Sequence, residues 1–273
     1  MKLIIFTIVL DGQPFLSRHL EEFEKLSIPW EWRISEGTSA NTNCTTWCKP
    51  QMPSLSRDGS SEYLTKISKH PNVKIRRRML WAGGKVEMCN ACLSGIEEDC
   101  ILLQVDVDEF FSAGQMERIV EMFEEQPDAM RAFFWCRYFL GRNIVATNTD
   151  GYSNRKVGEW LRAFRYTKGM QFSRHEPPVL NENRGLAITR DETGRQGLVF
   201  EHFAWSLESQ IAAKARLYPY PNALEHWKRL QENKVWPVRN LSEFLPWVGE
   251  GASADLFSNA YPDEVNPMEQ FKA

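Results

Sequence analysis

The clearest chemical signal in the sequence is an apolar run that ends in two aspartates. Residues 101–111 read ILLQVDVDEFF, so Asp106 and Asp108 stand one residue apart behind a hydrophobic segment. Two carboxylates that close repel each other, and a divalent cation bound between them removes the repulsion. Mg²⁺ and Mn²⁺ commonly combine one or two carboxylates with the phosphates of a substrate. The motif therefore predicts a metal site that neutralises a diphosphate leaving group, with a solvated acidic turn as the alternative.

The elements that must position this motif alternate along the chain. Apolar stretches predict strands at residues 2–10, 30–35, 73–78, 100–105, 132–139, 159–166 and 198–203. Amphipathic spacing predicts helices at residues 14–26, 60–68, 84–97, 115–125 and 207–217. Residues 38–57 are rich in Ser, Thr, Asn and Pro and are expected to form a loop. This order predicts an α/β fold in which helices flank a mostly parallel central sheet.

In such a sheet, ligands bind beside the carboxyl ends of the strands. Asp11 follows the first predicted strand, Glu36 the second, and the segment 106–109 the fourth. We therefore expect these acidic residues on one rim of the sheet. From about residue 236 the chain is rich in Pro, Gly and aromatic residues, and we expect this end to wrap the domain or to form a flexible lid.

The composition excludes several classes of partner. The 273 residues carry a net charge of −3, and the one basic run, residues 76–78, is expected to be an exposed strand end, so no nucleic-acid partner is predicted. No apolar stretch is long enough to span a bilayer. The apolar run at residues 3–10 is short and lacks a cleavage site, which argues against a signal peptide. We expect a soluble, cytoplasmic protein.

Six cysteines offer a second kind of metal chemistry. Cys44, Cys48, Cys89 and Cys92 form two pairs that a four-thiolate zinc site would use, but the first pair has the spacing CxxxC and the second falls in a predicted helix. Reduced, mostly buried thiols are the favoured interpretation.

Several segments in a fixed order resemble bacterial and viral glycosyltransferases related to the large inverting family 2. The segments are TIVLDGQPFLSRHLE, WRISEG, SRDGSSEYL, LLQVDVDEFF, EWLRAFRY with RHEPP, and FEHFAWSLESQIAAKARLY. The resemblance covers residues 3 to about 220 and implies a GT-A fold. It implies a catalytic domain at 1–220, with a nucleotide-binding half at about 1–112 and an acceptor-facing half at about 113–220. Residues 221–273 would be a C-terminal extension or lid.

The resemblance also implies an activity and a metal site. The expected reaction moves a sugar, with inversion, from a nucleotide-diphosphate donor to a hydroxyl of a carbohydrate, glycolipid or glycoprotein. Asp106 resembles the residue that faces the donor's ribose or a metal-bound water, and Asp108 the residue that holds the metal directly. His202, in EHFAW, resembles a histidine that completes the metal site; a structural histidine is the alternative. An imidazole ligand favours Mn²⁺ over Mg²⁺.

The remaining site residues are assigned by the same resemblance. Glu176, in RHEPP, resembles the base that takes the proton of the acceptor hydroxyl, with a surface His-Glu pair as the alternative. The positions assigned to the nucleotide or the donor are Asp11, Glu36, Asp58, Lys85, Asn90, Arg162, Arg165 and His175. His175 would orient Glu176 or contact a phosphate. Arg162 and Arg165 stand three apart on a predicted strand and face opposite sides, so we expect one of them to reach the diphosphate. Many relatives have Asn at the position of Asp11 and a shorter loop at 38–57.

Ten tryptophans add candidates for sugar binding. Trp47, Trp81, Trp160 and Trp205 are considered for the acceptor groove, with packing in the core as the alternative. Three other functions compete with sugar transfer. A phosphatase of the haloacid-dehalogenase class carries its aspartates on the first strand, and a nucleotidyltransferase would show a Gly-rich basic loop near the N-terminus. A non-catalytic sugar- or nucleotide-binding protein of the same fold is not excluded by the fold.

Overall fold

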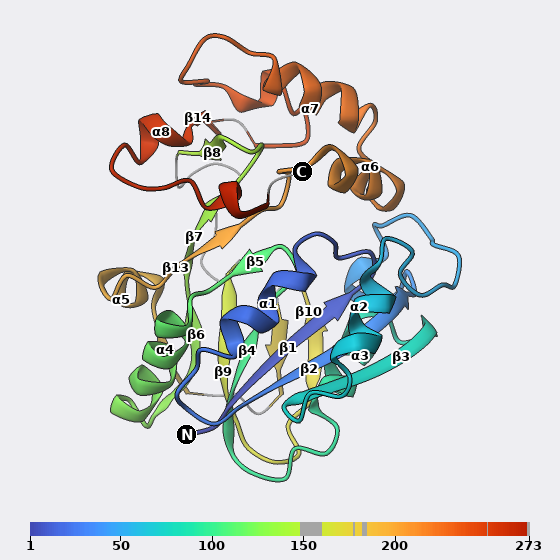
Figure 1. Cartoon of the computed structure of the whole chain (residues 1–273), viewed down its shortest axis with the longest axis vertical. Helices are drawn as coiled ribbons and strands as arrows, with labels where there is room; N and C mark the ends of the chain where they lie inside the picture. Colours follow the sequence, from blue (N-terminus) through green and yellow to red (C-terminus); the bar gives the residue numbers. More distant parts are fainter. Residues whose placement is uncertain (148–159, 177, 182–184, 250, 272–273) are drawn as a thin grey trace.

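A seven-stranded sheet forms the centre of the computed structural model, which describes residues 1–147, 160–176, 178–181, 185–249 and 251–271 (Figure 1). From one edge to the other the strands are β12 (Leu186–Ile188), β6 (Ala129–Phe133), β9 (Leu161–Tyr166), β4 (Cys100–Gln104), β1 (Leu3–Val9), β2 (Trp30–Ser39) and β3 (Val73–Trp81). Strand β9 is antiparallel to both neighbours, and the other pairings are parallel. The sheet is therefore mostly parallel, as predicted.

The two faces of the sheet are covered by different helices. Leu3 and Ile5 of β1 belong to a core shared with α1 (Leu16–Phe23), α2 (Ser60–Ile67) and α4 (Ala113–Glu125). Ile4 and Phe6 alternate with them and belong to a second core. That second core is shared with α3 (Gly84–Leu93) and the hairpin of β10 (Phe172–His175) and β11 (Pro178–Leu180). A strand buried on both faces needs such a continuous apolar run.

A second, three-stranded sheet brings a distant segment to the end of β4. Its order is β5 (Glu109–Phe110), β13 (Val199–His202) and β7 (Trp135–Tyr138). The antiparallel register of β13 and β5 pairs His202 with Glu109. The chain order alone does not predict this pairing, because 92 residues separate the two positions in the sequence.

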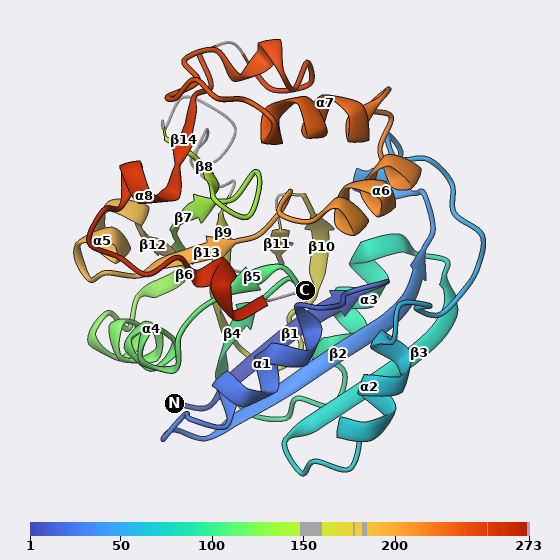
Figure 2. The same ribbon diagram turned by 45° about the horizontal axis from the view of Figure 1, so that its top comes forward.

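The C-terminal part lies at one end of the molecule (Figures 1 and 2). It contains α6 (Glu208–Leu217), α7 (Ala223–Gln231), η2 (Leu241–Glu243), β14 (Ala254–Leu256), α8 (Phe257–Ala260) and η3 (Pro267–Phe271). Strand β14 pairs antiparallel with β8 (Ile144–Ala146), and the ring of Phe271 lies 4.9 Å from that of Phe15. The last described residues therefore pack against the start of α1.

Some element boundaries differ from the prediction. The single strand predicted at 132–139 is divided into β6 and β7, which belong to different sheets. Strand β2 continues to Ser39, past the predicted end at residue 35. It passes through Gly37, whose φ of +129° and close approach to the carbonyl of Arg78 no side chain would tolerate. The loop predicted at 38–57 contains η1 (Asn43–Thr45), and α5 (Arg190–Arg195) was not predicted.

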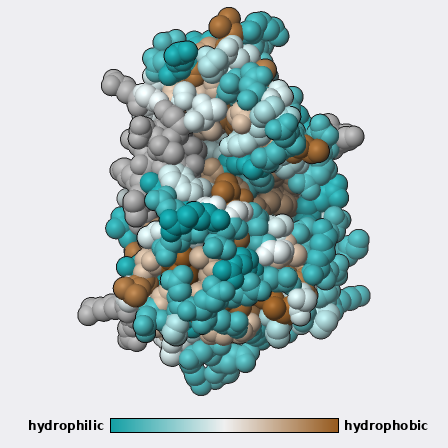
Figure 3. All heavy atoms as spheres, turned by 90° about the vertical axis from the view of Figure 1, so that its left-hand side faces the viewer, coloured by the Kyte–Doolittle hydropathy of each residue, from teal (hydrophilic) through white to brown (hydrophobic). Residues whose placement is uncertain are grey.

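The surface is that of an ordinary folded domain. Hydrophilic side chains predominate on the face in Figure 3, and hydrophobic ones gather there in small patches. Among the helices of the described part, none is long and apolar enough to cross a membrane.

Candidate active site

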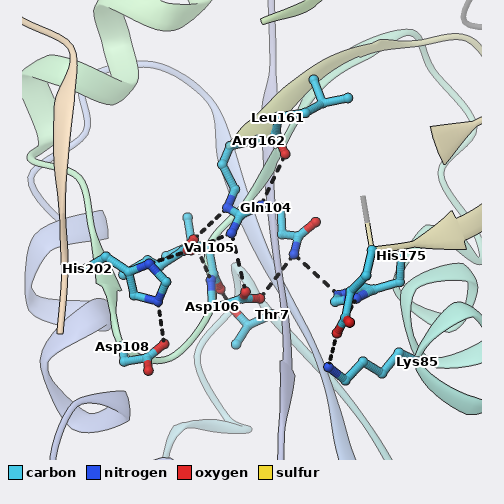
Figure 4. Close-up of polar contacts among 12 residues, drawn as sticks. Thr7, Lys85, Gln104, Val105, Asp106, Asp108, Leu161, Arg162, His175 and His202 are labelled. Carbon is cyan, nitrogen blue, oxygen red and sulfur yellow. Dashed lines mark hydrogen bonds and ion pairs between the residues drawn. The ribbon is translucent and has the colours of Figure 1, made fainter. Parts of the chain in front are cut away.

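One cavity of about 620 Å³ brings the predicted acidic and basic residues together. Its polar lining residues are Lys85, Gln104, Asp106, Asp108, Arg162, His175, Glu176, His202 and Lys214. They come from the end of β4, from β9, from the β10–β11 hairpin, from β13 and from two helices. Figure 4 shows the labelled side chains among them converging on one space: those of Lys85, Gln104, Asp106, Asp108, Arg162, His175 and His202. Seven of the nine were predicted from the sequence; Gln104 and Lys214 were not.

Asp108 is the most enclosed acidic group that lines this cavity. Its residue is 9% exposed, and its Oδ1 atom lies 3.7 Å from Nε2 of His202. Its Oδ2 atom accepts hydrogen bonds from Gln210, at 2.9 Å, and from Lys214, at 3.3 Å. Burial would raise the pKa of Asp108, but the charge of Lys214 and the neighbouring His202 lower it below its ordinary value. Asp108 is therefore an anion at neutral pH.

His202 is held as a neutral imidazole. Burial lowers the pKa of His202 to about 4, although the charge of Asp108 opposes this effect. Its Nδ1 atom is buried, lies 3.7 Å from Oε1 of Glu109, and has no hydrogen-bond partner among the described residues. The neutral form is the one that binds metals, because a ring nitrogen must offer a lone pair.

Asp108 and His202 could hold a divalent cation that takes most of its ligands from the phosphates of a substrate and from water. In the described part of the chain, no three His, Cys, Asp or Glu side chains form a group that could hold a metal. The side chains of Asp108 and His202 could supply two ligands, and Mn²⁺ or Mg²⁺ often takes its remaining ligands from phosphates and water. The observation that fits such an ion is the enclosed carboxylate of Asp108 facing Nε2 of the neutral His202 ring at 3.7 Å.

Asp106, the first aspartate of the motif, faces a buried arginine. Arg162 binds the fully buried Glu109 through two hydrogen bonds, of 2.8 Å from Nε and 2.5 Å from Nη2. Its Nη2 atom also lies 3.7 Å from Oδ2 of Asp106, whose other oxygen accepts a 3.1 Å hydrogen bond from Gln104. Arg162 thus places a guanidinium at the cavity wall.

The other arginine of this strand lies away from the cavity. Arg165 donates from Nε to the carbonyl of Ala129, at 3.0 Å, and from Nη2 to the carbonyl of Phe123. Ala129 belongs to β6 and Phe123 to α4. Of the two arginines, Arg162 lines the cavity and Arg165 does not.

Glu176 lies across the cavity as part of an ion pair. Its carboxylate binds the ammonium of Lys85 and lies 3.6 Å from Nδ1 of His175, while Nε2 of His175 lies 3.4 Å from Nε2 of Gln104. Burial would raise the pKa of Glu176, but the contact with His175 and the charge of Lys85 lower it to about 2. Burial lowers the pKa of Lys85, yet Tyr218 and Glu176 outweigh burial and raise it above its ordinary value.

Besides Arg165, four residues predicted to contact the donor do not line this cavity. Glu36 is fully buried, with its Oε2 atom 2.9 Å from Nε of Arg77. Asp11 accepts from the backbone of Arg57, and Asp58 from that of Gln13, both at 2.7 Å, so the two carboxylates tie the end of β1 to the start of α2.

The fourth is Asn90, which makes two hydrogen bonds to the backbone of Phe172, at 2.9 and 2.7 Å. It therefore fastens β10 to α3. Sheet position alone does not distinguish such structural partners from ligand contacts, because side chains of one strand alternate between two faces.

A smaller cavity of about 160 Å³ adjoins the first and shares Ile8 and Lys85 with it. The ends of β1 and β2, residues 39–51 and the end of α6 line it. Most of its lining is apolar, and Oδ1 of Asn41 is buried there without a hydrogen-bond partner in the described structure. A flat polar ring with apolar faces suits a space of this size and lining.

Three of the four candidate tryptophans line the larger cavity, and the fourth does not. Trp47, Trp160 and Trp205 line the larger cavity. Trp81 does not; it is buried and donates from Nε1 to the carbonyl of Glu36, at 2.9 Å. The described cysteine side chains are buried and form no disulfide with one another; they are those of Cys48, Cys89, Cys92, Cys100 and Cys136. The side chain of Cys44 lies outside the described structure.

Two functional candidates that the sequence did not reveal are Lys214 and Gln210. They stand four apart on α6 and therefore lie on the same face of the helix, which they present to Asp108. The segment FEHFAWSLESQIAAKARLY contains both, and its helical spacing was the available signal. Only the tertiary structure shows that this face of the helix contacts Asp108.

Comparisons with known proteins give distant similarities. No protein-family model and no curated protein matches the chain. Residues 1–349 of TarS from S. aureus match with a TM-score of 0.44 and 12% identity, over 72% of this chain and 63% of that chain. The mannosyltransferase PcManGT from Pyrobaculum calidifontis, in complex with GDP-Man and Mn²⁺, matches with a TM-score of 0.45 and 13% identity, over 98% and 77%.

A UDP-glucose pyrophosphorylase complexed with UDP-glucose matches with a TM-score of 0.32 and 10% identity, over 79% of this chain and 97% of that chain. These similarities place the chain in no family, so its function has to be inferred from the residues of the cavity.

Proposed function

We propose that the protein transfers a sugar from a nucleotide-diphosphate donor to a hydroxyl acceptor, with help from a divalent metal and with inversion. One observation carries the proposal. A single cavity unites an Asp-His pair, a second carboxylate beside a histidine, and three cationic side chains, Lys85, Arg162 and Lys214. Cations suit a diphosphate, and a separate carboxylate suits proton removal from a hydroxyl.

The donor would occupy both cavities. Its nucleobase would enter the smaller one, where the free Oδ1 atom of Asn41 can accept a hydrogen bond from the edge of the base. Its diphosphate would lie near Lys85, which lines both spaces. Lys85 and Arg162 would then neutralise the charge that develops on the leaving diphosphate.

Asp108 and His202 would hold the metal, which we propose to be Mn²⁺ or else Mg²⁺. A bound cation of this kind supplies Lewis-acid stabilisation of the leaving phosphate oxygens. Asp106 would face the same region from the start of the motif, held in place by Gln104. Arg162 and Glu109 form the buried support behind these residues.

Glu176 would act as the base. Its carboxylate would accept the proton of the acceptor hydroxyl while the hydroxyl oxygen forms a bond to the anomeric carbon and the nucleoside diphosphate departs. Such a single displacement inverts the anomeric centre. In the free protein, Lys85 lowers the basicity of Glu176. Phosphates that attract Lys85 would weaken this ion pair and raise the pKa of Glu176 toward the range of a useful base.

The test begins with calorimetric titration of the protein with UDP, GDP, CDP and dTDP, with and without Mn²⁺. We expect one nucleotide to bind, and Mn²⁺ to strengthen its binding. In Asp108→Asn, the effect of Mn²⁺ should disappear. Glu176→Gln should still bind the nucleotide but lose about 10²- to 10⁴-fold in transfer. Asp58→Asn, which changes a carboxylate outside both cavities, is the matched control.

Two results would contradict the proposal. If a folded protein binds none of the nucleotides, the donor assignment fails. If a nucleotide binds but neither donor hydrolysis nor transfer occurs with any Mn²⁺ concentration, a non-catalytic binding protein becomes the better interpretation. Proton NMR of the first product formed reports the anomeric configuration and tests inversion separately.

A further inference from the structure

An exposed aromatic stack stands at the wall of the larger cavity. The rings of Trp47 and Tyr218 lie 5.2 Å apart with an interplanar angle of 16°, and both residues line the cavity. Trp47 is 45% exposed, although it is one of the largest apolar side chains. Tryptophan that is left exposed beside a cavity, rather than buried in the core, is typical of a binding surface.

Other aromatic rings support this pair from behind. Tyr218 packs against Tyr220 at 5.7 Å, and Tyr220 stacks on Trp247 at 4.8 Å and 11°. Trp205 lies 5.4 Å from Trp247. Trp247 does not line the cavity, whereas Tyr220 and Trp205 do. Each ring is fixed by its neighbours, so the stack is a preformed platform rather than a set of mobile side chains.

Two segments far apart in the sequence build the platform. Trp47 follows η1, in the segment after β2, and Tyr218 directly follows α6. Hydrogen bonds from the backbone of Lys49 to the carbonyl of Leu217, at 2.7 Å, and from its ammonium to the carbonyl of Ala215, at 3.0 Å, join the two segments. The segment after β2 is thereby held against α6 and carries Trp47 to the wall of the cavity.

The groups beside the platform are polar and charged. Lys85 and Glu176 line the same cavity, and both are close enough to Tyr218 to influence its pKa. An occupant must therefore offer an apolar face to the rings and hydrogen-bonding groups to the ion pair. A sugar ring does both, because its C–H bonds gather on one face and its hydroxyls project from the edge. A lipid chain would offer no hydrogen-bonding group to this ion pair and would exclude water from it, which is costly.

A nucleobase also has flat apolar faces, but a separate space suits it better. The smaller cavity, which holds the free Oδ1 atom of Asn41, lies between the ends of β1 and β2 and does not include Trp47. We propose that the Trp47–Tyr218 platform binds a sugar ring of the acceptor and turns one of its hydroxyls toward Glu176. The proposal rests on the proposed transferase function and names its acceptor class as a carbohydrate.

The experiment uses the full chain and ligand-observed NMR. Methyl glycosides of glucose, galactose, mannose and N-acetylglucosamine, and the matching disaccharides, are titrated in the presence of the nucleotide that binds. We expect at least one sugar to bind, with the strongest saturation transfer to the hydrogens of one ring face. Trp47→Ala should weaken this sugar about 3- to 10-fold, as expected for the loss of one aromatic contact. It should leave nucleotide affinity unchanged.

Trp47→Phe and Met52→Ala serve as controls. Phe at position 47 keeps a stacking face and should restore most of the sugar affinity. Met52 is 82% exposed and lines neither cavity, so its replacement should change nothing. Because Trp47 is exposed, its removal should not unfold the protein, and the melting temperature verifies this.

Two outcomes overturn the proposal while leaving the transferase function intact. In one, a nucleotide binds but no sugar does. In the other, Trp47→Ala weakens nucleotide binding and not sugar binding, which would assign the platform to the nucleobase. If sugars bind through Trp47 while no nucleotide binds, the platform stands and the transferase function fails.

Discussion

The ammonium of Lys214 lies 3.3 Å from Oδ2 of Asp108, the carboxylate that we propose as the metal ligand. Lys214 also donates a hydrogen bond to the carbonyl of Ala204, and its ammonium is 5.5 Å from the ring centre of Trp205. The protein thus provides a cation for Asp108 from its own chain. A divalent ion that binds Asp108 must either share the carboxylate with this ammonium or displace it.

We therefore expect Lys214→Met to bind Mn²⁺ more tightly than the unmodified protein when no nucleotide is present. Two unit charges 4 Å apart interact by about 1 kcal/mol in water, which corresponds to about a five-fold change in affinity. The measurement is a calorimetric Mn²⁺ titration. Lys228→Met is the matched control, since Lys228 pairs with Glu208 at 2.6 Å and does not line the cavity. Equal Mn²⁺ affinity in all three proteins would mean that Lys214 and the metal do not compete.

The lowered pKa of Glu176 predicts that the folded state becomes less stable as the pH falls. Its pKa falls from 4.5 to about 2 on folding, so the folded state favours the ionised form. This contribution is fully present above pH 4.5 and is lost as the pH falls from 4.5 toward 2. The melting temperature of the unmodified protein should exceed that of Glu176→Gln at about pH 6, and the difference should narrow below pH 4.5 and largely disappear only near pH 2. A difference that stays constant over this range would show that the ion pair with Lys85 does not stabilise the fold.

Arg162 should be required for folding as well as for the site. Arg162→Met leaves Glu109 buried without its bidentate partner, and breaking such a buried pair costs about 3–5 kcal/mol. Urea unfolding measures the loss. The double variant Arg162→Met with Glu109→Gln should recover much of it, because the stranded charge is removed. Arg118→Met provides a matched surface control, since Arg118 pairs with Glu121 and Glu125 in solvent and should cost about 1 kcal/mol or less. Equal losses for the two arginines would contradict the inferred burial cost.

Sequence periodicity was sufficient for the elements that build the central sheet. Continuous apolar runs identified β1 and β4, because a parallel strand buried on both faces must be apolar throughout. Sequence periodicity was insufficient for the short strands, most of which lie in the second half of the chain. Strand β5 has two residues and β12 has three, so neither is long enough to show an alternation. Their existence depends on partners that are far away in the chain.

The residues that line the candidate site were predictable where chemistry and strand position coincide. Asp106 and Asp108 follow an apolar strand, so both type and place were readable. Glu36 shows the opposite case: it lies on the correct strand, but its side chain is buried and bound to Arg77 rather than open to a cavity. Deciding between the two faces of a strand requires the helices that cover them. Lys214 was missed because its partner, Asp108, is 106 residues away.

The smaller cavity allows a last prediction that separates the nucleotide from the acceptor. Ala40 lines this cavity and not the larger one, so Ala40→Leu should fill space that we assign to the nucleobase. We expect nucleotide affinity to fall by at least about ten-fold, since a pocket of 160 Å³ cannot hold both groups without strain. Sugar binding at the Trp47 platform, followed by NMR without nucleotide, should be unchanged. Ala82→Leu adds the same side chain at an exposed position that neither cavity includes and is the control. If Ala40→Leu binds nucleotide as well as this control does, the base must lie elsewhere, and the larger cavity would then have to hold the whole donor beside Lys85.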